Sequence, residues 1–280
     1  MYNGRAARGP ASVLGKMQPF ARKGNAIVLT CFFCLESNMK AIVTGHTRGL
    51  GEAIAAELLA RGIPVLGLSR SRSAALAAGY PKLLEQLEID LSDSKTIGHW
   101  LSSGAVEDFF EDAKLVLLVN NAGTVQPVGP LQEQDPLAVG AAVALNVAAP
   151  MMLAAGLVAA TPGASWRILH VSSGAGSNAY PGWSVYGATK AALDHHARAA
   201  TLDAVPGLLV CSLSPGVINT DMQAEIRATP VEKFPNRQRF IELERTGQLA
   251  EPVECARRVV DYLLCKHFAD NPVDDLRSLS

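Results

Sequence analysis

The chain has 280 residues, of which 49% are hydrophobic and 18% are charged. This length and composition suit one large hydrophobic core and are short for two full domains, so we expect a single domain. The formal net charge of −1 at pH 7 disfavours binding to nucleic acid or to an anionic membrane, because both need clustered, unpaired Lys and Arg. We therefore expect a small-molecule partner.

Five cysteines are scattered along the chain. An odd number without the spacing of a disulfide framework favours a reducing, cytoplasmic location. Cys31 and Cys34 form a CxxC pair, but no second pair of Cys or His lies at zinc-site spacing, so we expect no metal site.

Residues 1–38 differ in composition from the rest of the chain. Their charged side chains are almost all basic, and an apolar run over 26–35 follows them. That pattern resembles a targeting peptide, although the run is too short to span a bilayer. Because Met39 begins MKAIVTG, a natural start for a first strand, we interpret 1–38 as an N-terminal extension outside the fold. A cleaved signal is the alternative.

From Met39 to the C-terminus, short apolar runs alternate with helix-length Ala- and Leu-rich stretches. Uniformly apolar strands separated by helices indicate a parallel sheet that is buried on both faces. With right-handed crossovers this predicts a single-domain, Rossmann-type α/β fold, doubly wound, with helices on both faces of the sheet. Ligands bind such sheets at the carboxyl ends of the strands. The expected strands are 41–43, 65–68, 87–89, 115–119, 167–171 and 208–213.

A glycine-rich loop, residues 44–51, follows the first expected strand and leads into a helix over 52–60. Glycines permit a tight turn and let a pyrophosphate approach the positive end of the helix. The spacing differs from GxGxxG, and a plain turn is the alternative interpretation of this loop taken alone. The candidate dinucleotide contacts here are Gly45, Thr47, Arg48, Gly49 and Leu50.

The second expected strand ends in Ser69 and Arg70, where many dinucleotide sites carry an acidic residue for the adenosine ribose. A guanidinium pairs with a 2′-phosphate, whereas a carboxylate repels it. Together with Arg48, Arg70 therefore predicts NADP(H) rather than NAD(H). The alternative is that these arginines are solvated surface charges.

The next two strand ends carry further polar turns. Asp90 and Leu91 end the third strand, and Asp90 suits a hydrogen bond to the adenine edge. Asn121, Ala122 and Gly123 belong to an Asn-Asn-Ala-Gly turn that ends the fourth strand and suits a chain passing close to a cofactor. Each could be an ordinary turn, but their placement at successive strand ends favours a binding role.

No charged residue lies between Asp135 and Arg167, and residues 136–160 are mostly apolar. The segment is long enough to cross a membrane. Asn146, Pro150 and the lack of basic flanks argue against that. We expect instead a helix clamped between the sheet and a partner subunit.

Tyr186 and Lys190 are four residues apart in a helix expected over 184–204, which places them on one face. A tyrosine has a pKa of about 10, and a neighbouring ammonium favours the phenolate, so we expect a lowered pKa for Tyr186 and a role as proton donor to a carbonyl. Lys190 can also hold the nicotinamide ribose. A serine hydroxyl after the fifth strand, in Ser172-Ser173-Gly174, could stabilise charge on the substrate oxygen.

These motifs together resemble the short-chain dehydrogenases/reductases over roughly residues 39–267. TGHTRGLG matches that family's TGxxxGxG, and NNAG matches outright. The family's serine-to-tyrosine interval selects Ser173 over Ser172. The resemblance implies that Asn146 is the catalytic asparagine, which helps hold a water that relays protons to Lys190. It also implies a PGxxxT loop at the cofactor, formed by Pro215, Gly216, Val217 and Thr220.

A finer resemblance is to the NADPH-dependent sepiapterin reductase and benzil reductase branch. It rests on Thr-Asp-Met-Gln at 220–223, on 240–243, and on Gly-Gln-Leu at 247–249 with Pro252. The chain departs from the branch at 271–280, where we find neither the usual final strand with V-D-G-G nor a matching acid to anchor a substrate. That departure puts a pterin substrate in doubt.

Several other residues have weaker expectations. Trp183 is a candidate wall of the substrate pocket, and His46 could touch the cofactor because it lies in the glycine loop. His170 is expected to be buried or paired in its strand. His195 and His196 are expected to be solvated or to face another subunit, since neither shares the Tyr186/Lys190 spacing.

The sequence thus predicts an NADPH-dependent reductase acting on a small ketone or diketone, with a polar lid over 221–246. The alternative is a dinucleotide-binding sensor or scaffold with little turnover. The intact set of Asn146, Ser173, Tyr186 and Lys190 favours the enzyme. The family resemblance further implies a homodimer or homotetramer built on the helices that contain Asn146 and Tyr186.

Overall fold

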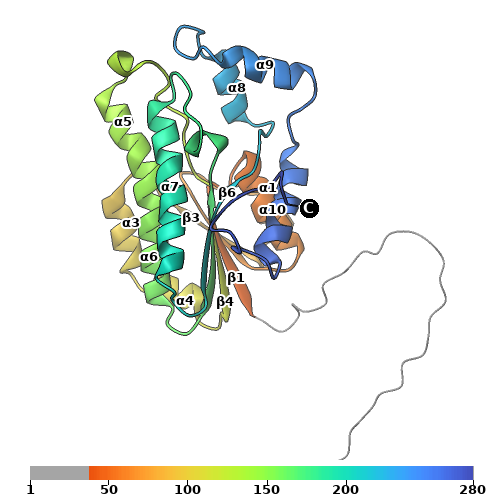
Figure 1. Ribbon diagram of the computed structural model, residues 1–280. Coiled ribbons are helices and arrows are strands. Elements are labelled where there is room, and N and C mark those ends of the chain that lie inside the picture. The colour runs from red at the N-terminus through yellow and green to blue at the C-terminus, as the bar shows by residue number, and fades with distance from the viewer. Residues whose placement is uncertain (1–37, 280) are drawn as a thin grey trace, which may run out of the picture. The chain divides into compact units, whose positions relative to one another are not determined.

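The computed structural model describes residues 38–279. The expected extension therefore lies outside the described residues except for Asn38, and so do Cys31 and Cys34. The described chain contains one parallel sheet with the order β3-β2-β1-β4-β5-β6-β7 (Figure 1). Its strands are β1 Met39–Thr44, β2 Val65–Ser69, β3 Leu84–Glu88, β4 Leu115–Asn120, β5 Ser165–Val171, β6 Leu208–Ser214 and β7 Val273–Asp275.

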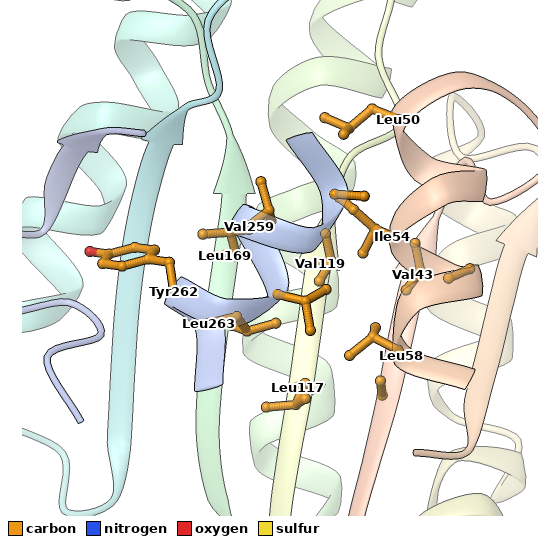
Figure 2. Packing of buried hydrophobic residues seen from close by; sticks show 14 of the residues in the cluster. Val43, Leu50, Ile54, Leu58, Leu117, Val119, Leu169, Val259, Tyr262 and Leu263 are labelled. Atoms are coloured by element: carbon orange, nitrogen blue, oxygen red, sulfur yellow. The ribbon is translucent and has the colours of Figure 1, made fainter. Parts of the chain in front are cut away.

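Helices cover both faces of the sheet, as Figure 1 shows. On one face α1 and α10 pack over β1, β4 and β5 through side chains such as Ile54, Val119 and Leu263 (Figure 2). On the other face α3, α4, α6 and α7 bury residues including Ile97 and Leu153. The α-helices are α1 Gly49–Ala60, α2 Ala74–Gly79, α3 Ser94–Leu101, α4 Ala105–Phe110, α5 Pro136–Val143, α6 Ala149–Ala160, α7 Ser184–Leu202, α8 Asp221–Ala228, α9 Arg237–Arg245 and α10 Pro252–Leu264.

The doubly wound fold is confirmed, with two differences in boundaries. β3 begins at Leu84 rather than at 87. It is an edge strand with Glu85 and Glu88 exposed, so its sequence is less apolar than that of a central strand and its start is harder to predict. The first helix begins at Gly49 instead of 52, so the glycine loop itself forms its first turn.

The expectation that residues 271–280 lack a final strand is wrong. β7 pairs in parallel with β6, and backbone bonds at both ends fix it: Ser212 N donates to Pro272 O at 2.9 Å, and Leu276 N donates to Ser214 O at 2.9 Å. The strand forms without the expected glycines because its pairing depends on main-chain groups.

The uncharged segment is one continuous helix over 136–160, made of α5, a π-helical stretch η2 (Ala144–Ala148) and α6. Asp135 caps its start by accepting hydrogen bonds from the N–H groups of Leu137 and Ala138. The helix is long and apolar enough to cross a membrane, with a mean hydropathy of 1.9, yet α6 packs against α3 and β5 within the fold. Leu137 is 83% exposed, so part of the apolar surface of this helix faces solvent.

A chain of polar side chains, Asn120, His170 and His196, joins β4, β5 and α7. His170 is fully buried; its Nδ1 lies 3.1 Å from Asn120 Nδ2 and its Nε2 lies 3.1 Å from His196 Nδ1. The expectation that His170 is buried or paired is therefore confirmed. His195 is exposed, as expected, whereas His196 is half-buried against His170. Burial, aided by the charges of His196 and Lys190, lowers the pKa of His170 to about 3.

This burial predicts acid sensitivity of the fold. The folded pKa lies below the unfolded value of about 6.5, so the unfolded chain takes up a proton first, and stability falls as pH drops from about 6.5 towards 3. Between pH 7 and pH 5 the loss from this residue should be about 2 kcal/mol. His170→Gln should remove that part of the pH dependence, measured as the free energy of unfolding by denaturant.

The matched control is His195→Gln, a change at an exposed position of the neighbouring helix. It should retain the wild-type pH dependence. Identical slopes for the wild type and His170→Gln would contradict the assignment.

Candidate active site

The glycine loop between β1 and α1 is shaped for a close approach to the start of the helix. Gly45 and Gly49 have φ values of +68° and +58°, which favour glycine. A Cβ at Gly51 would lie 2.2 Å from the Gly45 carbonyl oxygen, so that position admits no side chain. Arg48 precedes the helix and makes no side-chain cap to it. The N–H groups of the first turn are therefore suited to an anion.

The Asn-Asn-Ala-Gly turn is fixed to this loop. Thr44 Oγ1 accepts hydrogen bonds from the N–H groups of Asn121 and Ala122, both at 2.9 Å, and Asn121 Nδ2 donates to Thr44 O at 3.0 Å. A Cβ at Gly123 would lie 3.2 Å from Asn146 Oδ1. The ends of β1 and β4 thus lie side by side, and the turn after β4 passes close to Asn146.

The ends of β2 and β3 carry the candidate ribose contacts. Thr47 and Ser69 hydroxyls lie 3.3 Å apart. Arg72 is paired with Glu88 at 2.8 Å, whereas no salt bridge to the exposed Arg70 is found over residues 38–279. Arg70 is therefore better placed than Arg72 to meet an anion in solution.

The third strand is followed by an exposed turn. Asp90 Oδ1 accepts from the N–H and the hydroxyl of Ser92, at 2.9 and 2.7 Å. These bonds, and to a smaller extent the charge of Arg70, lower the pKa of Asp90. The side chain of the next residue, Leu91, is buried in the core.

Tyr186 and Lys190 lie on one face of α7, and both are buried. Lys190 Nζ donates to Val171 O at 2.8 Å and lies 5.7 Å from the centre of the tyrosine ring. Burial lowers the pKa of Lys190 to about 8, while the charge of Asp194 opposes that shift.

The expected lowering of the tyrosine pKa is not found. Burial raises the pKa of Tyr186, and its hydrogen bond with Ser173 opposes the shift without cancelling it. The physical reason is desolvation, which disfavours the phenolate and outweighs the favourable contact.

Ser172 and Ser173 point to different partners, as successive residues of an extended chain do. Ser173 interacts with Tyr186, and its Oγ accepts a bond from Ala175 N at 3.2 Å. Ser172 Oγ instead donates to the buried carboxylate of Asp194 at 2.7 Å. Of the two serines, Ser173 is thus the one that acts on Tyr186, whereas Ser172 is bound to Asp194.

Asn146 lies in the π-helical stretch and is buried. Its Oδ1 accepts from Thr124 N at 2.9 Å, and its Nδ2 donates to Thr124 O at 2.8 Å and to Thr189 Oγ1 at 3.1 Å. Pro150, four residues later, has no N–H to donate to the Asn146 carbonyl. That main-chain oxygen therefore lacks its usual α-helical donor.

The segment over 221–246 folds into α8 and α9 above the carboxyl ends of the strands (Figure 1). It packs on the site through aromatic rings. Trp183 stacks on Phe234 at 4.5 Å between centroids and meets the ring of Tyr186 edge-on at 5.2 Å. Phe240 also lies against Trp183, at 5.5 Å. Trp183 thus contacts both Tyr186 and the segment over 221–246.

Polar contacts join the segment over 221–246 to the loops that follow β1 and β4. Arg48 lies 3.5 Å from Asp221, with both side chains more than 70% exposed. Gln126 Nε2 donates to Glu225 Oε1 at 2.6 Å. A cavity of about 300 Å³ lies between the loop that contains Gln126 and the segment over 221–246, with Lys233 in its wall. Tyr186 does not line it.

A family model for short chain dehydrogenases matches residues 39–231. The chain belongs to the short-chain dehydrogenase family. It is 33% identical over 249 residues to benzil reductase ((S)-benzoin forming) of Bacillus cereus, covering 83% of this chain and 96% of that one. Sepiapterin reductase of Meriones unguiculatus is 31% identical over 237 residues, covering 79% and 90%. The resemblance to that branch is thus confirmed.

A solved structure supports the same family membership. A short-chain dehydrogenase/reductase from Burkholderia vietnamiensis is 48% identical, with a TM-score of 0.64, and the match covers 87% of this chain and 99% of that one. As a short-chain dehydrogenase, the chain is an oxidoreductase of the carbonyl-reductase type that uses NAD or NADP and a small-molecule substrate.

The structure brings most of the expected site residues of this short-chain dehydrogenase to one edge of the sheet. Pro215, Gly216, Val217 and Thr220 follow β6, and the Thr220 methyl lies 3.3 Å from where a Cβ of Gly49 would be. His46 is an exception among the weaker expectations, because it is fully buried and its Nε2 lies 2.8 Å from Gln86 Oε1.

Sequence reasoning missed two groups of residues. Asp194 is one helical turn beyond Lys190, a spacing that could have revealed it. Gln126 and Glu225 are far apart in the sequence and lie in no motif, so no signal pointed to their contact.

Proposed function

We propose that this short-chain dehydrogenase reduces the carbonyl of a small ketone or diketone to an alcohol, with NADPH as the hydride donor. The observation that carries the proposal is the set of Asn146, Ser173, Tyr186 and Lys190, in which Ser173 is half-buried and the other three side chains are buried. A Cβ at Gly123, in the Asn-Asn-Ala-Gly turn, would lie 3.2 Å from Asn146 Oδ1 and 3.8 Å from Lys190 Nζ. Proton transfer to a carbonyl needs the tyrosine hydroxyl, whereas binding of a dinucleotide alone does not.

The residues present fit a dinucleotide. The glycine loop has no room for a Cβ at Gly51, and the start of α1 offers N–H groups to a pyrophosphate. Arg48 and Arg70 supply positive charge for a 2′-phosphate, which supports NADP(H) over NAD(H). The other residues that we assign to the cofactor are Gly45, Thr47, Gly49, Leu50, Ser69, Asp90, Leu91, Asn121, Ala122, Gly123, Tyr186, Lys190, Pro215, Gly216, Val217 and Thr220.

When bound, the nicotinamide supplies the hydride that reduces the carbonyl carbon. Ser173 and Tyr186 hold the carbonyl oxygen, and the Tyr186 hydroxyl gives it a proton, which completes the alcohol. The raised pKa of Tyr186 keeps that proton in place at neutral pH. Lys190 would hold the ribose and help return a proton to the tyrosine, and a water held near Asn146 would relay a proton to Lys190.

The walls around the tyrosine favour an apolar substrate. Trp183, Phe234 and Phe240 form an aromatic cluster with Tyr186, and Val125 and Ile226 extend it. Because α8 and α9 supply part of this cluster, we propose that the segment over 221–246 acts as a lid that moves when substrate enters. An aryl ketone or diketone suits these walls better than a polar pterin.

The second candidate function is a dinucleotide-binding sensor or scaffold with little turnover. The glycine loop and the arginines would serve it equally well. The Ser173–Tyr186 contact favours the reductase, since a sensor has no need of a proton donor there.

We also propose a homo-oligomer located in the cytoplasm. The uncharged helix over 136–160 leaves Leu137 and Val143 exposed, at 83% and 43%, and a second copy would remove this apolar surface from water. Analytical ultracentrifugation should find a dimer or tetramer at micromolar concentration, and Leu137→Glu should shift it towards the monomer. A monomeric wild type would contradict the proposal.

The reductase assignment is tested by NADPH oxidation with benzil, other diketones, simple aryl ketones and sepiapterin. Tyr186→Phe removes the hydroxyl and keeps the ring that packs on Trp183, so turnover should fall at least a hundredfold, in line with the loss of a general acid. NADPH affinity, measured by fluorescence, should stay within about threefold because no charge is lost. Near-wild-type turnover of the variant would rule out Tyr186 as the acid, and tight NADPH binding without turnover of any carbonyl would favour the sensor.

Cofactor preference is tested at Arg70. Arg70→Glu should weaken NADPH binding by about tenfold or more and leave NADH binding nearly unchanged, because only NADPH carries the 2′-phosphate. Arg72→Glu is the matched control, since Arg72 is already paired with Glu88, and it should change the ratio of the two affinities much less. Equal losses for NADPH and NADH in Arg70→Glu would refute the phosphate contact.

A further inference from the structure

A buried carboxylate lies one helical turn beyond Lys190 on the same face of α7. Asp194 is only 3% exposed. An ionised carboxylate at such depth is costly unless hydrogen bonds and a nearby positive charge stabilise it. Asp194 has both: hydrogen bonds from two serines and the nearby charge of Lys190.

The hydrogen bonds of Asp194 hold the end of β5 and the strand β6. Its Oδ1 accepts from Ser172 Oγ and from Ser212 Oγ, both at 2.7 Å. Ser172 immediately precedes Ser173, and Ser212 lies in β6. One carboxylate oxygen on α7 thus accepts two short hydrogen bonds, which connect α7 to β6 and to the end of β5, next to Ser173.

The other carboxylate oxygen faces the turn that follows Ser173. A Cβ at Gly176 would lie 2.6 Å from Asp194 Oδ2 and 3.1 Å from the Lys190 carbonyl carbon. The turn η3 (Gly174–Gly176) is therefore pressed against α7 at this point. Both oxygens of Asp194 thus contact the segment that positions Ser173.

The charge of Asp194 acts on Lys190. The charged and titratable groups that face the ammonium are Asp194 and Tyr186 on α7 and His170 on β5. Burial keeps His170 neutral, and burial also favours the neutral phenol of Tyr186. Asp194 is therefore the negative charge that offsets the burial of Lys190.

We propose that Asp194 is a positioning residue of this site: its buried carboxylate fixes the strand end that carries Ser173 and supplies the negative charge that keeps Lys190 an ammonium. The part concerning turnover rests on the proposed reductase function. The part concerning the charge of Lys190 does not.

The charge role is tested without substrate, by ¹³C NMR of the full-length protein labelled at lysine Cε. The Lys190 signal is identified by its loss in Lys190→Arg. Asp194→Asn keeps the volume and the acceptor oxygen and removes the charge, so it should lower the titration midpoint of Lys190 by about one to two pH units. Ser212→Ala, which loses one hydrogen bond and keeps the charge, should leave the midpoint within about 0.3 units. An unchanged midpoint in Asp194→Asn would overturn the charge role.

The positioning role is tested with Ser172→Ala, a smaller change that also serves if Asp194→Asn does not fold. Freeing the strand end should lower kcat by about three- to tenfold, in line with one lost charge-assisted hydrogen bond, and leave the NADPH affinity within about twofold. Wild-type kcat in Ser172→Ala would overturn the positioning role. If the wild type reduced no carbonyl while the Lys190 midpoint still shifted in Asp194→Asn, the reductase proposal would fail and the charge role of Asp194 would stand.

Discussion

The hydroxyl of Thr44 joins the ends of β1 and β4, and the cofactor side of the molecule depends on that junction. It accepts hydrogen bonds from two successive N–H groups of the Asn-Asn-Ala-Gly turn. β1 and β4 are the neighbouring strands at which the winding of the sheet reverses, the place where doubly wound sheets open a crevice for ligands. One buried hydroxyl thus sets the distance between the glycine loop and the turn that leads to Asn146.

The chemical side depends in the same way on α7. Tyr186, Lys190 and Asp194 follow one another at intervals of four residues, so one helix face presents the proposed acid, its ammonium partner and a buried counter-charge in a row. Because the helix is rigid, the spacing of these groups is set by its geometry. The end of β5 and the strand β6 then bind that row through Ser172 and Ser212. The positions of these groups are thus fixed by regular elements, while α8 and α9 add side chains to the aromatic cluster around Tyr186.

The sequence was informative wherever a motif or a strongly apolar run expressed the local requirement. The parallel sheet and the strand ends followed from such patterns, whereas the choice of Ser173 rests on the family resemblance and stays a prediction. β7 did not, because a three-residue strand depends on main-chain pairing with β6 and needs no distinctive side chains. The shift of the Tyr186 pKa also could not be predicted, since the lysine spacing is visible in the sequence while the degree of burial is set by residues from distant segments. His46 turned inward because Gly67, on the next strand, leaves room for its ring.

The contact between Arg48 and Asp221 links the glycine loop to the first turn of α8, two segments that are far apart in the sequence. If an anion bound Arg48 in place of Asp221, α8 would lose this attachment to the loop. By thermodynamic reciprocity, detaching Asp221 would then raise the affinity of Arg48 for that anion by the same factor. The pair is exposed and therefore weak and screened by salt. The coupling between anion binding at Arg48 and the attachment of α8 would thus weaken as the ionic strength rises.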